Sequence, residues 1–180
     1  MLKNIQRSLV RISDIVNEFA KVFAIIMVIL LTIVVLLQVI FRYILNIGLP
    51  WVDEISRYLN VWVAFLGASI GFKYGDHVGV AFLTKKLPEK AEKIYKIITN
   101  IFMFVFLCLA IYYSYNYVVS SRSVTPMMRL PFQFPKAALL VGLSFMGIHH
   151  LSFIFSDIVS FFYPNTNTDI LNNDYKEGVR

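Results

Sequence analysis

Four uninterrupted apolar runs dominate this sequence, and each is long enough to cross a lipid bilayer. About 20 residues of α-helix, at about 1.5 Å each, span a hydrocarbon core of about 30 Å. The runs cover residues 22–41, 51–72, 97–118 and 136–162. Too few residues remain between them for a soluble domain. We therefore predict an all-α integral membrane protein in which residues 1–180 form a single membrane domain with four transmembrane helices.

Composition and motif content limit the function classes. Hydrophobic residues make up 58% of the 180 residues, whereas soluble domains are typically about 45–50% apolar. The single cysteine, Cys108, excludes a disulfide within the chain. The sequence contains no glycine-rich phosphate loop, no Cys/His metal spacing and no paired nucleophile and base. We therefore predict that the protein is not an enzyme and has no catalytic residues, no cofactor and no metal site.

The positive charges indicate how the chain is oriented. Most of the 17 lysines and arginines lie in residues 1–21, in the connection 73–96 or in the tail 163–180. With four spans these three segments share one side, and the positive-inside rule places them, with both termini, in the cytoplasm. The loop 119–135 then faces the outside. The net charge of +6 is explained by topology and lipid head groups, so we expect the bilayer, and no nucleic acid, as a partner.

The N-terminal segment, residues 1–21, has its own pattern. Apolar residues recur at helical spacing from Leu2 to Phe19, and Lys3, Arg7 and Arg11 occupy other faces. Such a segment suits the membrane interface, with its apolar face toward the acyl chains and its cations near the head groups. We therefore predict an N-terminal amphipathic interfacial helix at the cytoplasmic side, before the first span.

The second apolar run carries a stripe of polar and small residues along one helix face. Its members follow one another at intervals of three and four residues from Asp53 to Gly71. In lipid, small residues let helices approach closely, and polar groups need partners. We therefore predict that this helix contacts a partner subunit. The predicted contact residues are Asp53, Glu54, Arg57, Asn60, Trp62, Ala64, Gly67 and Gly71.

The charged end of this stripe also has a simpler interpretation. Pro50 suits the first turn of a helix, and Asp53 and Glu54 are favourable near its positive end. Arg57, one turn later, could pair with a carboxylate. A short turn joins the first two spans, which places Arg42 near the same carboxylates. Helix-end electrostatics and partner binding are compatible, and both remain open at this point.

Two further regions carry candidate contact residues. The outer loop 119–135 contains three prolines, so we predict that it is partly non-helical, and its Arg122 and Arg129 could meet an external partner. The fourth span carries His149, His150 and Asp157, and the last two lie on nearly the same face. Ionisable groups inside a span are expensive, so we predict that all three make intramembrane polar contacts with neighbouring helices.

Two other functions compete with partner binding. The chain could be an autonomous, oligomeric transporter or channel, coupled to protons or ions, in which His150, Asp157 and the Asp53/Glu54/Arg57 cluster form a relay. A membrane haem protein is less compatible with the sequence. Axial histidines face each other from two helices, whereas His149 and His150 are adjacent on one helix.

The order of several short motifs resembles a known family. Trp51, Glu54, Arg57, Trp62 and Gly67 are followed by Gly75-Asp76-His77-Val78, then by Thr125-Pro126 and Leu130-Pro131. This pattern resembles the small membrane subunit of tripartite ATP-independent periplasmic (TRAP) transporters, the DctQ-like component. The resemblance covers all four spans. Ala81 departs from the pattern, since an acidic residue is common there in such proteins.

The resemblance implies a division of labour. A large, DctM-like membrane subunit carries the substrate and sodium sites and moves them like an elevator, and a periplasmic substrate-binding protein captures the substrate. The small subunit is non-catalytic and braces the large one. The expectation is thus a subunit of a sodium-coupled importer of organic acid anions, such as C4-dicarboxylates or sialic acid, in the bacterial inner membrane. Arg122 and Arg129 could help to dock the periplasmic protein.

Overall fold

The chain folds into four long helices. The computed structural model describes residues 2–74 and 89–162. The helices, in chain order, are α1 (Leu2–Tyr43), α2 (Pro50–Tyr74), α4 (Glu89–Val119) and α5 (Gln133–Phe162). All four are long and apolar enough to cross a membrane. No strand occurs within the described ranges, where one isolated bridge joins Val124 and Pro131. The all-α, four-span fold class is therefore confirmed.

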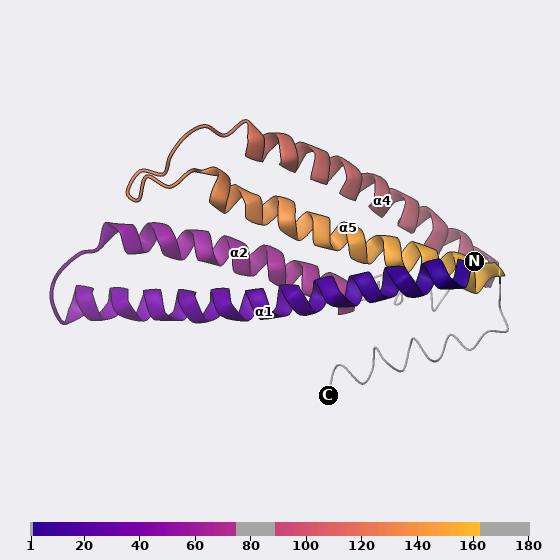
Figure 1. The fold of residues 1–180 in the computed structure, drawn as a ribbon, viewed down its shortest axis with the longest axis horizontal. Helices are drawn as coiled ribbons and strands as arrows, with labels where there is room; N and C mark the ends of the chain where they lie inside the picture. The colour runs from indigo at the N-terminus through magenta and orange to yellow at the C-terminus, as the bar shows by residue number, and fades with distance from the viewer. Residues whose placement is uncertain (1, 75–88, 163–180) are drawn as a thin grey trace.

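The helices run side by side along the long axis of the molecule as two hairpins, α1–α2 and α4–α5 (Figure 1). The connection 44–49 and the loop 120–132 lie at the same end, which we call the loop end. The N-terminus, the start of α4 and the end of α5 lie at the opposite end, which we call the terminal end. This arrangement makes α2 parallel to α5 and antiparallel to α1.

Three of the helices form the apolar core. α1, α2 and α5 pack against one another, and α4 packs on α5. The buried apolar residues at their meeting line are Ala20, Met27, Leu59, Trp62, Leu66 and Ala138. α2 and α5 approach each other closely at Gly142, where an added Cβ would lie 2.8 Å from the Cβ of Phe65. A small residue at this position permits the close approach of two helices, as is common inside membranes.

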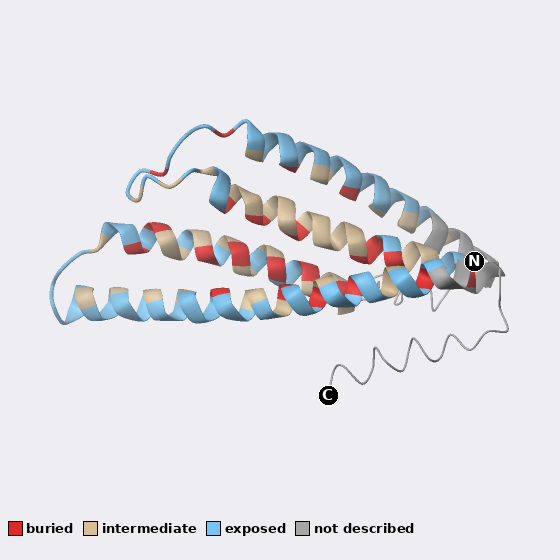
Figure 2. Ribbon diagram, viewed as in Figure 1, coloured by how far each residue is buried: buried red, intermediate tan, exposed pale blue. Residues whose placement is uncertain are grey.

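The outside of the bundle is apolar and much of its interior is polar. Most of α1 and of the described part of α4 is exposed (Figure 2), and many of the exposed residues there are isoleucine, leucine, valine and phenylalanine. Buried polar residues include Ser13, Asn17, Ser69 and Ser152. A protein in water would have the opposite distribution, whereas lipid requires polar groups to be satisfied inside the protein. The chain is therefore a multi-pass membrane protein.

The helix bounds differ from the predicted ones at the N-terminus. α1 is a single helix of 42 residues, about 63 Å long at about 1.5 Å per residue, so residues 2–21 are not separated from the first span. Part of this segment packs into the bundle instead of lying flat in the interface, because its Ser13, Asn17 and Ala20 face is buried. The apolar residues Ile12 and Phe19 point outward, 48% and 61% exposed.

The other predicted spans 51–72, 97–118 and 136–162 lie within α2, α4 and α5. The predicted connection 73–96 is shorter, because Lys73 and Tyr74 end α2 and Glu89 begins α4. The Gly75-Asp76-His77-Val78 motif, Ala81 and the tail 163–180 lie outside the described residues.

Candidate functional site

The polar and small stripe of α2 lies on the outside of the bundle. Its members Asp53, Arg57, Asn60, Ala64, Gly67 and Gly71 are all exposed. A Cβ added to Gly67 or to Gly71 would meet no atom within 4 Å. The small residues of this stripe are therefore not needed for packing inside the chain. We call these six residues the α2 seam; their contact with a partner remains a prediction.

Two residues of the predicted contact set do not belong to the seam. Glu54 is 2% exposed and Trp62 is 6% exposed. The ring of Trp62 lies 5.5 Å from that of Phe23 and 5.7 Å from that of Phe134, measured between centroids. These side chains contact this chain itself, because they lie on the inward face of α2, away from the seam. The structure thus corrects their assignment to a partner surface.

The Glu54 carboxylate holds the loop 120–132. One oxygen, Oε2, accepts hydrogen bonds from the backbone N–H of Met127 at 2.8 Å and of Met128 at 3.3 Å. The other, Oε1, accepts one from the Tyr58 hydroxyl at 2.9 Å. Bonds from a carboxylate to backbone N–H groups are among the stronger hydrogen bonds in proteins. Glu54 therefore fastens the loop to the first turns of α2.

The loop is itself folded around the motif residues. The Thr125 N–H donates to the Leu130 carbonyl at 2.8 Å, and the Leu130 N–H donates to the Thr125 hydroxyl at 3.1 Å. Arg129 adopts a left-handed conformation with φ of 52°, which is uncommon outside glycine. Thr125-Pro126 and Leu130-Pro131 thus bracket a closed turn; Arg129 is exposed on the turn, and Arg122 is exposed in the three residues before it.

The charges at the loop end of the seam pair differently from the prediction. The Asp53 carboxylate accepts a hydrogen bond from the Gln38 side chain of α1. The Nε of Arg57 donates to the backbone carbonyl of Asp53 at 3.2 Å and not to a carboxylate. Arg42 lies over the ring of Tyr43. The suggested pairing of Arg57 with a carboxylate is therefore not among the described contacts, in which Gln38 bonds to Asp53 and the loop and Tyr58 bond to Glu54.

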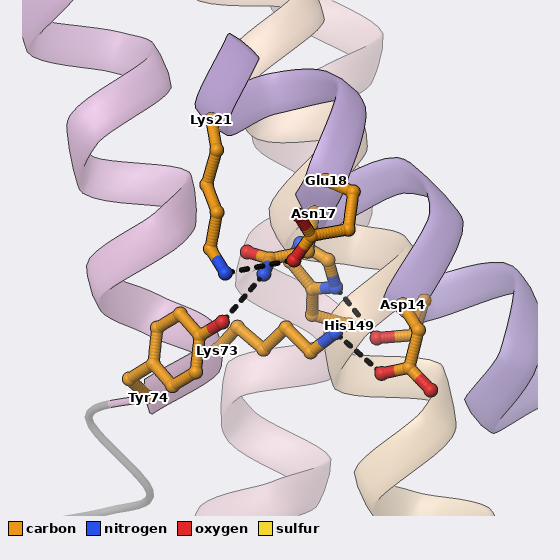
Figure 3. A network of polar contacts seen from close by, with 8 residues as sticks. Asp14, Asn17, Glu18, Lys21, Lys73, Tyr74 and His149 are labelled. Carbon is orange, nitrogen blue, oxygen red and sulfur yellow. Dashed lines mark hydrogen bonds and ion pairs between the residues drawn. The ribbon is translucent and has the colours of Figure 1, made fainter. Parts of the chain in front are cut away.

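A second polar cluster joins α1, α2 and α5 nearer the terminal end (Figure 3). The Lys73 ammonium, on a side chain 4% exposed, lies 2.6 Å from the Asp14 carboxylate. Tyr74 accepts a hydrogen bond from the Asn17 amide at 2.8 Å. The Ser13 hydroxyl lies 2.7 Å from the Nδ1 of His149. We call this group, with Lys21 and Glu18, the inner cluster.

Most of the inner cluster was not anticipated from the sequence. Lys73 lies in the segment predicted to be the cytoplasmic connection. Ser13, Asp14 and Asn17 lie in the segment predicted to be an interfacial helix. A signal was present, since the uncharged polar residues Gln6, Ser13 and Asn17 recur at helical spacing on one face of this segment. In a membrane protein such a polar face points toward other helices, and Gln6 indeed donates to the Ser156 hydroxyl of α5 at 3.2 Å.

The ionisable groups of α5 contact two different helices. His149 contacts α1 through Ser13. The Nε2 of His150 lies 3.0 Å from the carbonyl oxygen of Asn100 on α4. The side chain of the same Asn100 donates to the Asp157 carboxylate at 2.9 Å. These contacts connect α5 to α1 on one side and to α4 on the other.

The two ends of α2 are therefore both anchored. Glu54 and Lys73 lie 19 positions apart in one helix, about 28 Å at about 1.5 Å per residue, which is close to the thickness of a hydrocarbon core. The seam runs between these levels on the exposed face. The arrangement defines a helical membrane subunit whose internal polar groups are used for its own packing and whose second helix presents a free face.

Comparison with known proteins places this subunit in a family. Residues 31–160 match the family of tripartite ATP-independent periplasmic transporters, DctQ component. The chain belongs to that family, as the motif order indicated. It is a component of a TRAP transporter and not an enzyme.

Individual relatives agree with this assignment. A Haemophilus influenzae protein, provisionally named a TRAP transporter small permease protein, is 38% identical over 94 residues, covering 52% of this chain and 58% of its own. The C4-dicarboxylate TRAP transporter small permease protein DctQ of Vibrio cholerae is 32% identical over 79 residues, 44% of this chain and 34% of its own.

A third relative is a larger protein. The sialic acid TRAP transporter permease protein SiaT of Haemophilus influenzae is 34% identical over 77 residues, which are 42% of this chain and only 12% of its own. The matched segment is thus a small part of a much longer permease chain. In all three matches the alignment covers less than two thirds of the relative's length.

Proposed function

We propose that this chain is the small, non-catalytic permease subunit of a TRAP transporter in the bacterial inner membrane, and that it binds a large permease subunit through the α2 seam. The observation that carries the proposal is the exposure of all six seam residues along the length of α2. Small residues on a lipid-facing helix surface contribute to packing mainly when another helix approaches them closely. The SiaT relative supports a larger permease as the partner, since a similar segment occurs there within one long chain.

The proposed role is to brace the partner while it moves. α2 is tied to the loop by Glu54 near one end and to α1 by Lys73 near the other. A helix held at both ends resists displacement when a neighbouring element shifts against it. The large subunit would then carry the sodium and substrate sites, and the transported compound would be an organic acid anion such as a C4-dicarboxylate or sialic acid. Both termini face the cytoplasm in this arrangement.

Co-purification of the large permease with the tagged chain from native membranes, in mild detergent, tests the proposal. Gly67→Leu and Gly71→Leu place bulk on the seam without touching any atom of this chain within 4 Å of the new Cβ. We expect recovery of the large permease to fall about tenfold, because overpacking a close contact costs about 1–3 kcal/mol.

Cys108→Leu is the matched control, because Cys108 is also a small, exposed helical residue but lies on α4. It should leave co-purification unchanged. Equal recovery with the seam variants and the control would contradict the proposed binding surface. The described contacts of α5 join His149 to α1 and join His150 and Asp157 to α4, which supports a packing role for these residues in the proposed subunit.

A further inference from the structure

The loop 120–132 presents a cationic and apolar surface whose shape depends on one buried carboxylate. Residues 119–135 contain Arg122 and Arg129 and no aspartate or glutamate. Val124 and Met127 are 57% and 60% exposed on the same loop. The carboxylate bonded to the loop backbone, that of Glu54, is 2% exposed. It therefore orders the loop while contributing almost nothing to the accessible surface.

We infer that residues 122–130 form a preformed docking turn, which binds an acidic surface of a soluble protein on the outer side of the membrane. Glu54 is the positioning residue of this turn. The soluble protein is the periplasmic substrate-binding protein that the family resemblance implies, so this inference rests on the proposed function as a TRAP transporter subunit. The turn is closed by the reciprocal Thr125 and Leu130 bonds and is fastened to α2 at Met127 and Met128. A turn ordered before contact loses less conformational entropy on binding.

The exposed charges of the turn indicate the chemistry of the surface that it binds. Two exposed guanidinium groups flank two exposed apolar side chains, which is the composition of a protein-binding patch with a polar rim. Guanidinium groups pair bidentately with carboxylates, so the complementary surface is rich in aspartate and glutamate. The position of Glu54 also matters, because its neighbours Asp53 and Arg57 belong to the α2 seam. The first turns of α2 thus contact the docking turn through one face and present the α2 seam, the proposed contact with the large permease, on another.

Glu54→Gln separates the positioning role from a general structural role. The amide keeps the size of the side chain but replaces a charged double acceptor by a neutral group with one acceptor oxygen. In the purified complex we expect faster hydrogen exchange at the Met127 and Met128 amides and about tenfold weaker binding of the cognate substrate-binding protein. Co-purification of the large permease should stay unchanged.

Arg129→Asn tests the charge without disturbing the turn, since asparagine tolerates the left-handed conformation that Arg129 adopts. It should weaken docking, and reduce its salt dependence, while amide exchange at Met127 and Met128 stays as in the wild type.

Unchanged exchange in Glu54→Gln would overturn the positioning role, and so would loss of the large permease from that variant. Faster exchange with unchanged docking, or docking by Arg129→Asn at wild-type affinity, would overturn the docking turn. The proposed binding of the large permease to the α2 seam is tested separately, by co-purification with the Gly67→Leu variant.

Discussion

Gly142→Ala is the substitution whose cost the structure defines most closely. A Cβ at this position would lie 2.8 Å from the Cβ of Phe65, 2.9 Å from its carbonyl oxygen and 3.2 Å from its carbonyl carbon. Carbon atoms in favourable contact are about 3.5–4.0 Å apart. Two of the three opposing atoms belong to the backbone of α2, so a change of rotamer cannot relieve the clash. α2 and α5 must separate by about 1 Å, and overpacking of this kind costs about 1–3 kcal/mol.

The matched control is Gly67→Ala on the opposite face of the same helix pair. An added Cβ there meets no atom within 4 Å. Both substitutions replace a helical glycine by alanine and gain about the same helix propensity, about 1 kcal/mol, which cancels in the comparison. Gly142→Ala should therefore be less stable than Gly67→Ala by about 1–3 kcal/mol.

Unfolding of the full purified chain by titration with a denaturing detergent, followed by circular dichroism, measures this difference. Equal free energies of unfolding for the two alanine variants would refute the reasoning, because α2 would then not have one packed and one free face. A lower stability of Gly67→Ala would contradict it in the same way.

Two other predictions follow, one from the inner cluster and one from the proposed role as a non-catalytic subunit. Asp14→Asn should destabilise the full chain more than Lys73→Met, because Asp14→Asn leaves the buried Lys73 ammonium unpaired whereas Lys73→Met removes that charge. A double-mutant cycle should give a coupling energy of about 1 kcal/mol, since the Asp14 side chain is 55% exposed. A coupling energy of zero would show that the pair does not form. The purified chain alone, in liposomes with a sodium or proton gradient, should take up neither a C4-dicarboxylate nor sialic acid, and measurable gradient-driven uptake would restore the autonomous transporter.

The number of long helices and the position of each span within them followed from the sequence because lipid imposes a simple requirement. An apolar run of about 20 residues has few structures available in a bilayer other than a helix. The seam was also visible, since Asp53, Arg57 and Gly67 share a face by spacing alone, and the structure leaves that face open. Periodicity describes the relation of residues within one helix, and here it was sufficient.

The contacts between distant segments were not predictable in this way. Glu54 and Met127 are 73 positions apart, and Lys73 and Asp14 are 59 apart. Helical spacing carries no information about which helix faces which. The interpretation of the N-terminal segment was incomplete for a related reason. Its cationic residues Arg7 and Arg11 are exposed, but spacing alone did not show that the uncharged Ser13 and Asn17 would be buried against other helices.

Site-specific photocrosslinking in native membranes tests the central claim most directly. A photoreactive amino acid at Ala64, in the middle of the exposed α2 seam, should form a covalent adduct with the large permease. The same group at Phe102, which is 75% exposed on α4, serves as the comparison and should give no such adduct. An adduct from Phe102 with none from Ala64 would contradict the account, because the large subunit would then bind a face of this chain other than the α2 seam.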